Sequence, residues 1–288
     1  KTYSHLPPYE ELSLYHHKKI DKQEKQNIFY DQVNHLHQEQ MLRPEPPKTD
    51  GNNFSLSKED YLTIKNNVQK DIPYNEYLKG KSVAVVGPAP SLLKMELGEK
   101  IDGHDVVVRS NTGFPPPKHL SKHLGSRTDI HYHCLNEDDL GGGKLFMEEM
   151  QKELDYLCCP YPKWVDPFHR DIVRFENTNN GRLKFHCIDT DYYCNVVSKI
   201  GTRINSGIGT ILDLLSYDIE KMFITGYTFF EGESYIEDVR PNEIMEKYKK
   251  TNFDGRHFQE PQKDLIRLLY TSDDRIELDD VMKRILGV

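Results

Sequence analysis

The feature that most constrains the fold is a series of short apolar runs, each ended by glycine or by polar residues. The first run, Ser82–Gly87, reads Ser-Val-Ala-Val-Val-Gly and is typical of a strand buried on both faces of a parallel sheet. Stretches with helical patterns separate the runs. This alternation predicts an α/β fold, a Rossmann-like, doubly wound and mostly parallel sheet with flanking helices and a flap. The expected strands are 82–87, 105–109, 128–134, 156–158, 183–188 and 221–226.

Helices are expected where capping residues and apolar spacing agree. Ser57 is a good cap for a helix that carries Asp60 at its third position, and the prolines of 88–91 are typical of another helix start. Further helices are expected over 144–154, from 206 onward, over 242–250 and over 262–270. The segment 160–182 is expected to be loop-rich. The polar segment 240–256 is expected to be a mobile flap, because it has few residues for a core.

The first 58 residues differ from the rest in composition. They are rich in Lys, Glu, Gln and His, and they contain the proline group 44–47. We interpret residues 1–58 as a polar N-terminal extension or stem, and residues 59–288 as the main folded domain. A helix over about 20–42 would have only a thin apolar stripe, so the extension either packs weakly or folds onto the core as a small subdomain.

Composition and charge exclude some classes of function. The net charge of −8 argues against a general nucleic-acid binder but leaves room for a local basic pocket. No apolar stretch reaches the roughly 18 residues that a membrane helix needs. The chain starts at Lys1 rather than Met, so we expect a processed or truncated chain whose membrane contact depends on an upstream anchor. The five cysteines match no zinc or redox spacing, so neither a metal nor a cofactor is expected.

The stretch 202–212 has the pattern of an anion site. Arg203 precedes a polar turn in which Asn205 or Ser206 can cap a helix, and the small residue Gly207 leaves the first amides open. The apolar positions 208, 211, 212 and 215 share one helix face. The functional interpretation is a phosphate-binding helix start, and the alternative is an ordinary capped core helix.

Two expected strand ends carry further ligand-binding candidates. Gly87 ends the first strand ahead of a tight turn, and Asn111 follows the second, where ligands bind to sheets of this kind. The turn is neither a dinucleotide fingerprint nor a P-loop. The Asn111 amide can contact a base or a ribose, or it can simply cap a turn.

Three positions are candidates for chemistry. His257 stands between the flap and a helix start, and an imidazole can take a proton from a hydroxyl near neutral pH. Tyr235 lies in the loop after the strand 221–226, where a phenol can hydrogen-bond a departing phosphate or simply pack in the flap. His131 and His133 share a strand face, but no third metal ligand accompanies them.

Five motifs in order resemble the sialyltransferases, most closely the bacterial lipooligosaccharide type and more distantly the Golgi type. Val85–Leu92 looks like the strand-turn G-N-G-P-S-L of that family, and Val108–Asn111 looks like its R-x-N. Arg203–Gly207 is similar to R-I-T-S-G, Ile224–Tyr235 to the S-G-I-D-F-Y loop, and His257–Glu260 to H-S-K-E. The resemblance covers roughly residues 81–288 and implies that residues 59–288 are the catalytic, nucleotide-sugar-binding domain.

The resemblance implies an inverting, metal-independent transferase that moves sialic acid, or a Kdo-like acidic sugar, from a CMP-sugar to a glycan hydroxyl. His257 would be the base, Tyr235 would stabilise the departing phosphate, and Arg203 would hold the phosphate or the sugar carboxylate. The implied donor-binding residues are Gly87, Ser91, Arg109, Asn111, Asn205, Ser206, Gly207, Tyr227 and Phe230. The implied location is either the Golgi lumen, through an upstream anchor, or the cytoplasmic face of a bacterial membrane.

The chain departs from the family pattern at several positions. Pro88 replaces an asparagine, Phe230 replaces the first of two phosphate-binding tyrosines, and Asp254 replaces another tyrosine. Tyr227 can substitute for the tyrosine missing at position 230. These departures leave open another nucleotide sugar, or a nucleotide- or glycan-binding protein without transfer activity. A methyltransferase is disfavoured, because Arg109 ends the second strand where a ribose-binding carboxylate is usual.

Overall fold

A computed structural model describes residues 42–46, 54–231, 235–252 and 257–288 of the chain. By its internal contacts the chain divides into two units, Lys1–Leu42 and Arg43–Val288, and the second is described here. The helix expected over 20–42 lies outside the described residues. None of the helices in the described ranges is long and apolar enough to cross a membrane.

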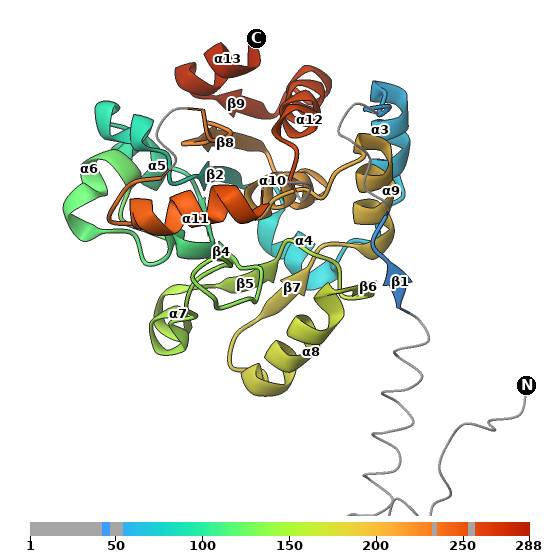
Figure 1. Ribbon diagram of the computed structural model, residues 1–288, viewed down its shortest axis with the longest axis horizontal. Coiled ribbons are helices and arrows are strands. Elements are labelled where there is room, and N and C mark those ends of the chain that lie inside the picture. Colours follow the sequence, from blue (N-terminus) through green and yellow to red (C-terminus); the bar gives the residue numbers. More distant parts are fainter. Residues whose placement is uncertain (1–41, 47–53, 232–234, 253–256) are drawn as a thin grey trace, which may run out of the picture. The chain divides into compact units, whose positions relative to one another are not determined.

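Seven parallel strands form one sheet in the order β7-β5-β4-β3-β2-β8-β9 (Figure 1). This confirms the predicted α/β, Rossmann-like fold. The strands are β2 (Ser82–Val86), β3 (Val106–Ser110), β4 (Ile130–Tyr132), β5 (Tyr156–Cys159), β7 (Phe185–Cys187), β8 (Lys221–Thr225) and β9 (Ile276–Leu278). All five residues of β2 are buried, as expected of a central parallel strand. A separate two-stranded sheet pairs β1 (Arg43–Pro44) with β6 (Val165–Asp166) in parallel.

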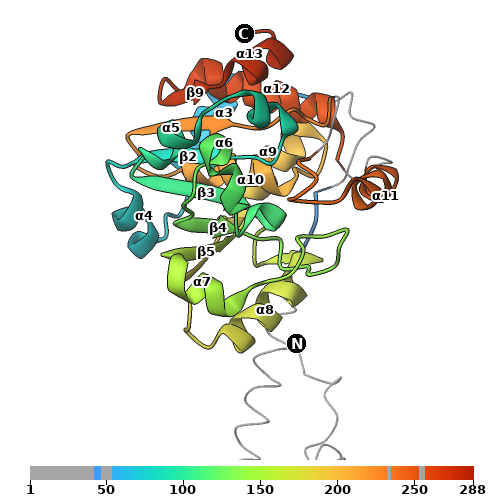
Figure 2. The ribbon, with the colours of Figure 1, turned by 90° about the vertical axis from the view of Figure 1, so that its left-hand side faces the viewer.

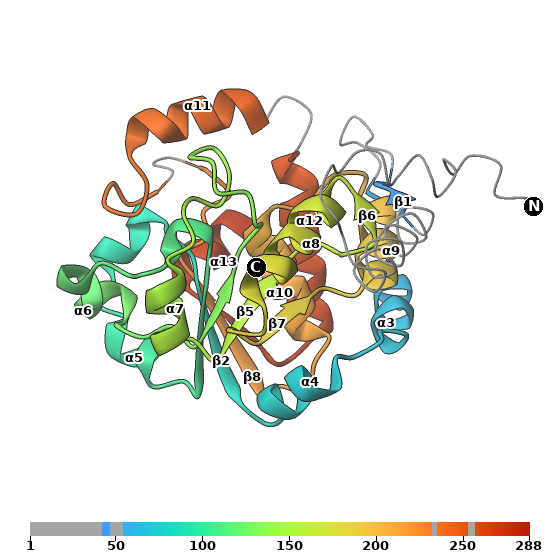
Figure 3. The same ribbon diagram turned by 90° about the horizontal axis from the view of Figure 1, so that it is seen from below.

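Helices cover both faces of the large sheet. The α-helices are α3 (Lys58–Asn66), α4 (Ile72–Leu78), α5 (Gly98–Asp102), α6 (Ser121–Leu124), α7 (Met147–Glu153), α8 (Phe168–Asn179), α9 (Thr190–Ile200), α10 (Ser206–Leu215), α11 (Asn242–Asn252), α12 (Gln259–Ser272) and α13 (Asp280–Leu286). Three short 3₁₀ helices are η1 (Pro90–Lys94), η2 (Asn111–Gly113) and η3 (Lys118–Leu120). Figures 2 and 3 show α11 lying outside the helices that cover the sheet.

The alternation of side chains along the strands divides the core in two. Val83 and Val85 of β2 belong to the larger cluster, which includes the apolar face of α10. Ala84 and Val86 belong to the smaller cluster, which also contains Leu92 of η1 and one residue each from α5 and α6. Successive strand residues therefore serve opposite layers, as the period of two requires.

Two local predictions are confirmed by the capping geometry. Ser57 and Asp60 form a reciprocal capping box at the start of α3. The Asn205 side chain accepts a hydrogen bond from the Ile208 amide at 3.0 Å, so Asn205 is the N-cap of α10. The predicted apolar face of this helix, residues 208, 211, 212 and 215, is at most 1% exposed.

One prediction is wrong. The segment 160–182, expected to be loop-rich, contains β6 and the twelve-residue helix α8. Its buried residues Phe168, Ile172 and Phe175 follow helical spacing. Prolines before the helix and asparagines at its end made the segment resemble a loop. Residues 43–46 also belong to the larger unit, because β1 pairs with β6.

A buried network of charged and aromatic side chains joins α10 to β4, β7 and the start of α4. His186 Nε2 lies 2.9 Å from Asp213 Oδ2, and Nδ1 lies 3.4 Å from Asp71 Oδ2. Tyr132 donates its hydroxyl proton to the same Asp213 oxygen at 2.6 Å, and Tyr74 stacks on the imidazole. Burial alone would lower the pKa of His186, but the two carboxylates raise it to about 9.

This network predicts a pH dependence of stability. Because the folded pKa of His186 exceeds the unfolded value, its contribution is complete below about pH 6.5 and is lost as pH rises to about 9. We expect the free energy of unfolding to fall by on the order of 3 kcal/mol over that range. Urea titrations at several pH values check this. His186→Gln should flatten the curve, whereas a similar substitution of exposed His119 should leave it unchanged; an unchanged curve for His186→Gln contradicts the assignment.

Candidate active site

The carboxyl ends of β2, β3 and β8 meet around one cavity, which we call the first cavity. Its lining includes the turn after β2, the polar end of β3, the start of α10 and the aromatic loop after β8. Predicted residues that line it are Gly87, Asn111, Asn205, Ser206, Gly207, Tyr227, Phe230 and Tyr235. Eight of the predicted site residues, drawn from four separate segments, are therefore brought together.

Two glycines allow the close packing of this site. A Cβ at Gly87 would lie 2.3 Å from the Gly226 carbonyl oxygen, so no side chain fits between the ends of β2 and β8. A Cβ at Gly207 would lie 2.4 Å from Cε1 of Tyr227. The first turn of α10 therefore presents its backbone amides to the cavity, which is the arrangement that binds anions.

Aromatic side chains fill much of the first cavity. About 80 Å³ of space remains, well below the roughly 300 Å³ of a typical ligand site. Phe230 stacks on Tyr235 with ring centroids 5.8 Å apart, and Phe229 and Phe230 both have positive φ angles. Such backbone is uncommon outside glycine and marks a constrained loop.

The Tyr227 hydroxyl is buried and makes no hydrogen bond to the described residues. Burial raises the pKa of this phenol, an effect that neighbouring Ser110 opposes, and burial also raises the pKa of Tyr235. Both phenols therefore keep their protons at neutral pH and can donate a hydrogen bond to an anionic ligand.

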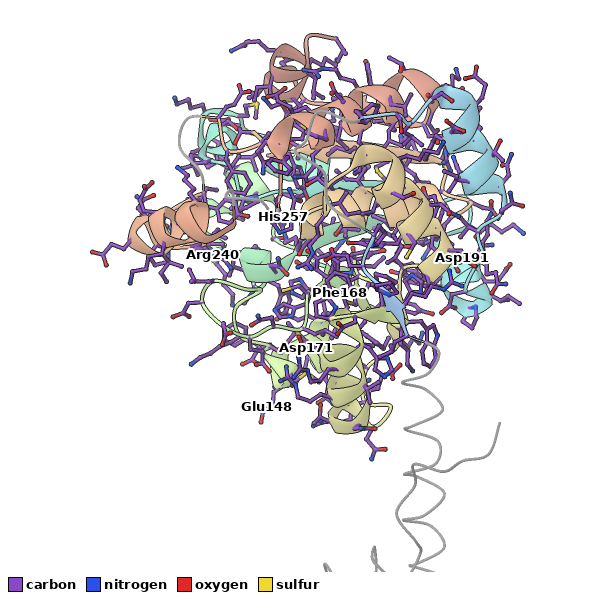
Figure 4. All side chains as sticks on the ribbon, turned by 45° about the vertical axis from the view of Figure 1, so that its right-hand side comes forward. Glu148, Phe168, Asp171, Asp191, Arg240 and His257 are labelled. Atoms are coloured by element: carbon purple, nitrogen blue, oxygen red, sulfur yellow. The ribbon has the colours of Figure 1, made fainter. Side chains whose placement is uncertain are left out.

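A second cavity adjoins the first and holds His257. It has a volume of about 450 Å³ and shares Asn111, Tyr161 and Ser206 with the first cavity. Figure 4 shows His257 near Arg240, with Phe168 and Asp171 of α8 below them. Arg203 and the first turn of α8 complete much of its wall.

The His257 ring is oriented by the backbone. It is 7% exposed, and its Nδ1 lies 3.0 Å from the Arg203 carbonyl oxygen. Because a carbonyl only accepts, Nδ1 carries the proton and Nε2 is the basic nitrogen of the neutral ring. This is the tautomer that a general base requires.

Two predicted donor-binding residues, Arg109 and Ser91, line neither cavity. Arg109 is 3% exposed, and its guanidinium donates to the Leu124 carbonyl at 2.6 Å and to Thr128 Oγ1 at 3.0 Å. Burial lowers its pKa to about 10. The structure therefore places Arg109 and Ser91 away from the two cavities. Arg109 lies within β3, and Ser91 lies in η1 after β2.

Asn111 and Arg203 line cavities but use part of their polar groups within the protein. The Asn111 Oδ1 accepts the Cys134 amide at 3.1 Å, which resembles the turn-capping alternative, while the residue still borders both cavities. The Arg203 guanidinium forms a bidentate ion pair with Glu45. Arg203 lies in the wall of the second cavity rather than the first.

The histidine pair does not form a metal site with the described residues. His131 and His133 are both buried. His133 Nε2 donates a hydrogen bond to the Gly143 carbonyl at 3.1 Å. Burial lowers the pKa of His133 to about 4. Within the described ranges, no group of three or more His, Cys, Asp or Glu side chains could hold a metal ion.

Sequence reasoning missed several residues of the site. Tyr161, Phe168 and Asp171 carry no motif and line the second cavity only through folding, and Glu45 pairs with Arg203 in its wall. Arg240 also went unnoticed, although its guanidinium donates to the Gly141 carbonyl at 2.6 Å and lies 5.7 Å from the Tyr235 ring centroid. Arg240 therefore links the flap to the glycine loop beside the second cavity.

Two joined cavities at the carboxyl edge of a parallel sheet lie where α/β proteins bind their ligands. The sequence profile of glycosyltransferase family 29 (sialyltransferase) matches residues 16–162, just over half of the 288-residue chain. The chain therefore belongs to glycosyltransferase family 29, the sialyltransferases, and is an enzyme of the transferase class. No curated protein sequence gives a significant match.

Solved structures of sialyltransferases resemble the chain at low sequence identity. A variant of the sialyltransferase CST-II in complex with CMP is 13% identical, with a TM-score of 0.50 over 72% of this chain and 86% of that chain. A mammalian sialyltransferase in complex with Gal-beta-1-3GalNAc-ortho-nitrophenol is 15% identical, with a TM-score of 0.45 over 81% of this chain and 89% of that chain. Cst-I from Campylobacter jejuni, described as a monofunctional alpha-2,3-sialyltransferase, is 16% identical, with a TM-score of 0.45 over 71% of this chain and 78% of that chain.

Proposed function

We propose that the chain transfers sialic acid from CMP-sialic acid to a hydroxyl of a glycan acceptor, with inversion and without a metal ion. One observation carries the proposal: a cavity with phosphate-binding chemistry adjoins a cavity that holds an oriented histidine. Ser206 and Asn111 border both cavities, so the reacting atoms would meet there. Family membership supports the sugar, and the CMP complex of the CST-II relative supports the nucleotide.

The first cavity would bind the donor. The phosphate would lie at the start of α10, against the amides of Ser206 and Gly207, where the helix dipole favours negative charge. The phenols of Tyr227 and Tyr235 would donate hydrogen bonds to the phosphate as it departs. These groups neutralise the leaving group with hydrogen-bond donors, which is the basis for proposing a reaction that needs no metal.

The second cavity would bind the acceptor. His257 Nε2 takes the proton of the acceptor hydroxyl while its oxygen forms a bond to the anomeric carbon. The bond from that carbon to the phosphate oxygen breaks, and its electron pair leaves with CMP. Because the base and the leaving group lie in different cavities, attack comes from the side opposite CMP, so a single displacement inverts the configuration.

The decisive experiment measures CMP release and glycan transfer from CMP-sialic acid and from CMP-Kdo, with and without glycan acceptors. We expect acceptor-dependent release from CMP-sialic acid, with CMP alone raising the melting temperature. CMP at 100 times its dissociation constant would stabilise the protein by about 2.7 kcal/mol. Turnover of CMP-Kdo only would overturn the donor, and CMP binding without any turnover would favour a binding protein.

Tyr235→Phe tests the phosphate contact. Loss of one hydrogen bond to a charged group costs about 1.5–3 kcal/mol, so we expect kcat to fall about 10- to 150-fold while Phe still stacks on Phe230. Tyr270→Phe, on α12 and outside both cavity linings, is the matched control. Steady-state kinetics in which the two variants behave alike would remove Tyr235 from the mechanism.

A further inference from the structure

Residues 43–46 pack against the wall of the second cavity. β1 pairs with β6 through Arg43 and Val165, and the Arg43 amide donates to the Trp164 carbonyl at 3.0 Å. The residues directly after β6, Pro167 and Phe168, line the second cavity. A segment remote in sequence from every motif therefore lies beside the site.

Glu45 fixes the Arg203 side chain in that wall. Arg203 donates from Nε and from Nη2 to the two carboxylate oxygens of Glu45, and the two side chains are only 16% and 13% exposed. The guanidinium carbon also lies 5.0 Å from the Phe168 ring centroid. A bidentate pair stacked on an aromatic ring holds an arginine in one geometry.

The backbone around Arg203 holds the segment that carries His257. The Arg203 carbonyl accepts the hydrogen bond from His257 Nδ1 at 3.0 Å, and Thr202 Oγ1 accepts the Phe258 amide at 3.1 Å. On the other side, the Asn205 amide donates to Gln262 Oε1 at 2.9 Å. The short segment 202–205 thus joins the imidazole to the start of α10.

We infer that Glu45 is a positioning residue of the transfer reaction: it fixes Arg203, whose carbonyl orients His257 as the base. The inference rests on the proposed function and goes beyond it, because it gives Arg203 a role in placing the base rather than in contacting the donor. It also makes residues 43–46 part of the active enzyme. The two roles of Arg203 predict different kinetics.

The test is a double-mutant cycle on the full chain. Glu45→Gln and Arg203→Met should each lower kcat about 10- to 100-fold, with the donor KM changed less than twofold, because a small displacement of a catalytic group has effects of that size. Glu45→Gln combined with Arg203→Met closes the cycle and removes both charges, so neither buried charge is left without its partner as it is in each single variant. Its kcat should be no lower than that of the single variants. Glu45→Asp should recover part of the loss.

Arg43→Gln is the matched control for loosening of the segment. Arg43 lies two residues from Glu45 and pairs with Asp191 at an exposed position, with side chains 54% and 62% exposed. We expect its kcat to equal that of the wild type. An equal loss in Arg43→Gln would show that the segment acts through general packing and would overturn the role of Glu45.

A readout that needs no turnover separates this inference from the proposed function. In the ¹⁵N spectrum of the imidazoles, wild-type His257 should be protonated at Nδ1, and Glu45→Gln should show a mixture of tautomers. An unchanged His257 spectrum, or a donor KM raised tenfold in Arg203→Met alone, overturns the inference. A wild type with the expected spectrum but no transfer would refute the function and leave the positioning contact supported.

Discussion

His257→Ala should lose at least about 10²-fold in turnover while it still binds CMP. General bases contribute about 10²–10⁴-fold, and this substitution removes the only oriented imidazole in the described lining of the second cavity. The nucleotide would bind in the other cavity, so its affinity should be nearly unchanged. Transfer assays and CMP-induced shifts of the melting temperature measure the two effects separately.

The exposed His119 provides the control for this variant. Its side chain is 67% exposed and pairs with Asp238 at the surface, so His119→Ala should be fully active. Since His257 is itself buried, the melting temperature of His257→Ala without ligand must be compared with the wild type. Wild-type turnover in a folded His257→Ala protein would refute the assignment of the base.

Asp213→Ala should have the largest effect on stability. It removes the carboxylate that accepts bonds from His186 and Tyr132, leaving a buried imidazolium without its nearest counter-charge. Removing one partner of a buried pair costs about 3–5 kcal/mol. Urea denaturation near pH 7 measures the change.

Asp218→Ala is the corresponding surface variant. Asp218 pairs with Lys70 where the side chains are 51% and 35% exposed, and exposed pairs contribute about 0–1 kcal/mol. Both variants remove one carboxylate, so the difference between their losses of unfolding free energy measures the effect of burial. A loss below 1 kcal/mol for Asp213→Ala would mean that the network does not stabilise the fold.

Local patterns predicted the fold and the start of α10 well. The Asn205 cap depends on residues four positions or fewer apart, and β2 is buried throughout because it is apolar throughout. The carboxyl ends of parallel strands meet at one edge, so motifs at those ends predicted which segments would line the first cavity. The helix α8 was missed even though Phe168, Ile172 and Phe175 have helical spacing, because its flanking residues favour turns.

The direction of a side chain and its distant partners were harder to predict. Arg109 and Ser110 are adjacent on β3, yet they serve opposite faces: Ser110 bonds Thr210 of α10, and Arg109 bonds the carbonyl of Leu124 in α6. A motif match does not say which of the two faces the ligand. The partner of Arg203 lies 158 residues away, and no local rule connects them.

The crowded first cavity sets a condition on donor affinity. With about 80 Å³ of space, a nucleotide sugar would need the Phe229 and Phe230 side chains to move aside before it could bind. The apparent dissociation constant then equals the intrinsic constant divided by the fraction of open molecules, so an open fraction of about 1% weakens binding about 100-fold. Substitutions that shrink Phe230 would therefore tighten donor binding even while they remove contacts, and donor affinity in this enzyme would report the loop equilibrium as much as the contacts themselves.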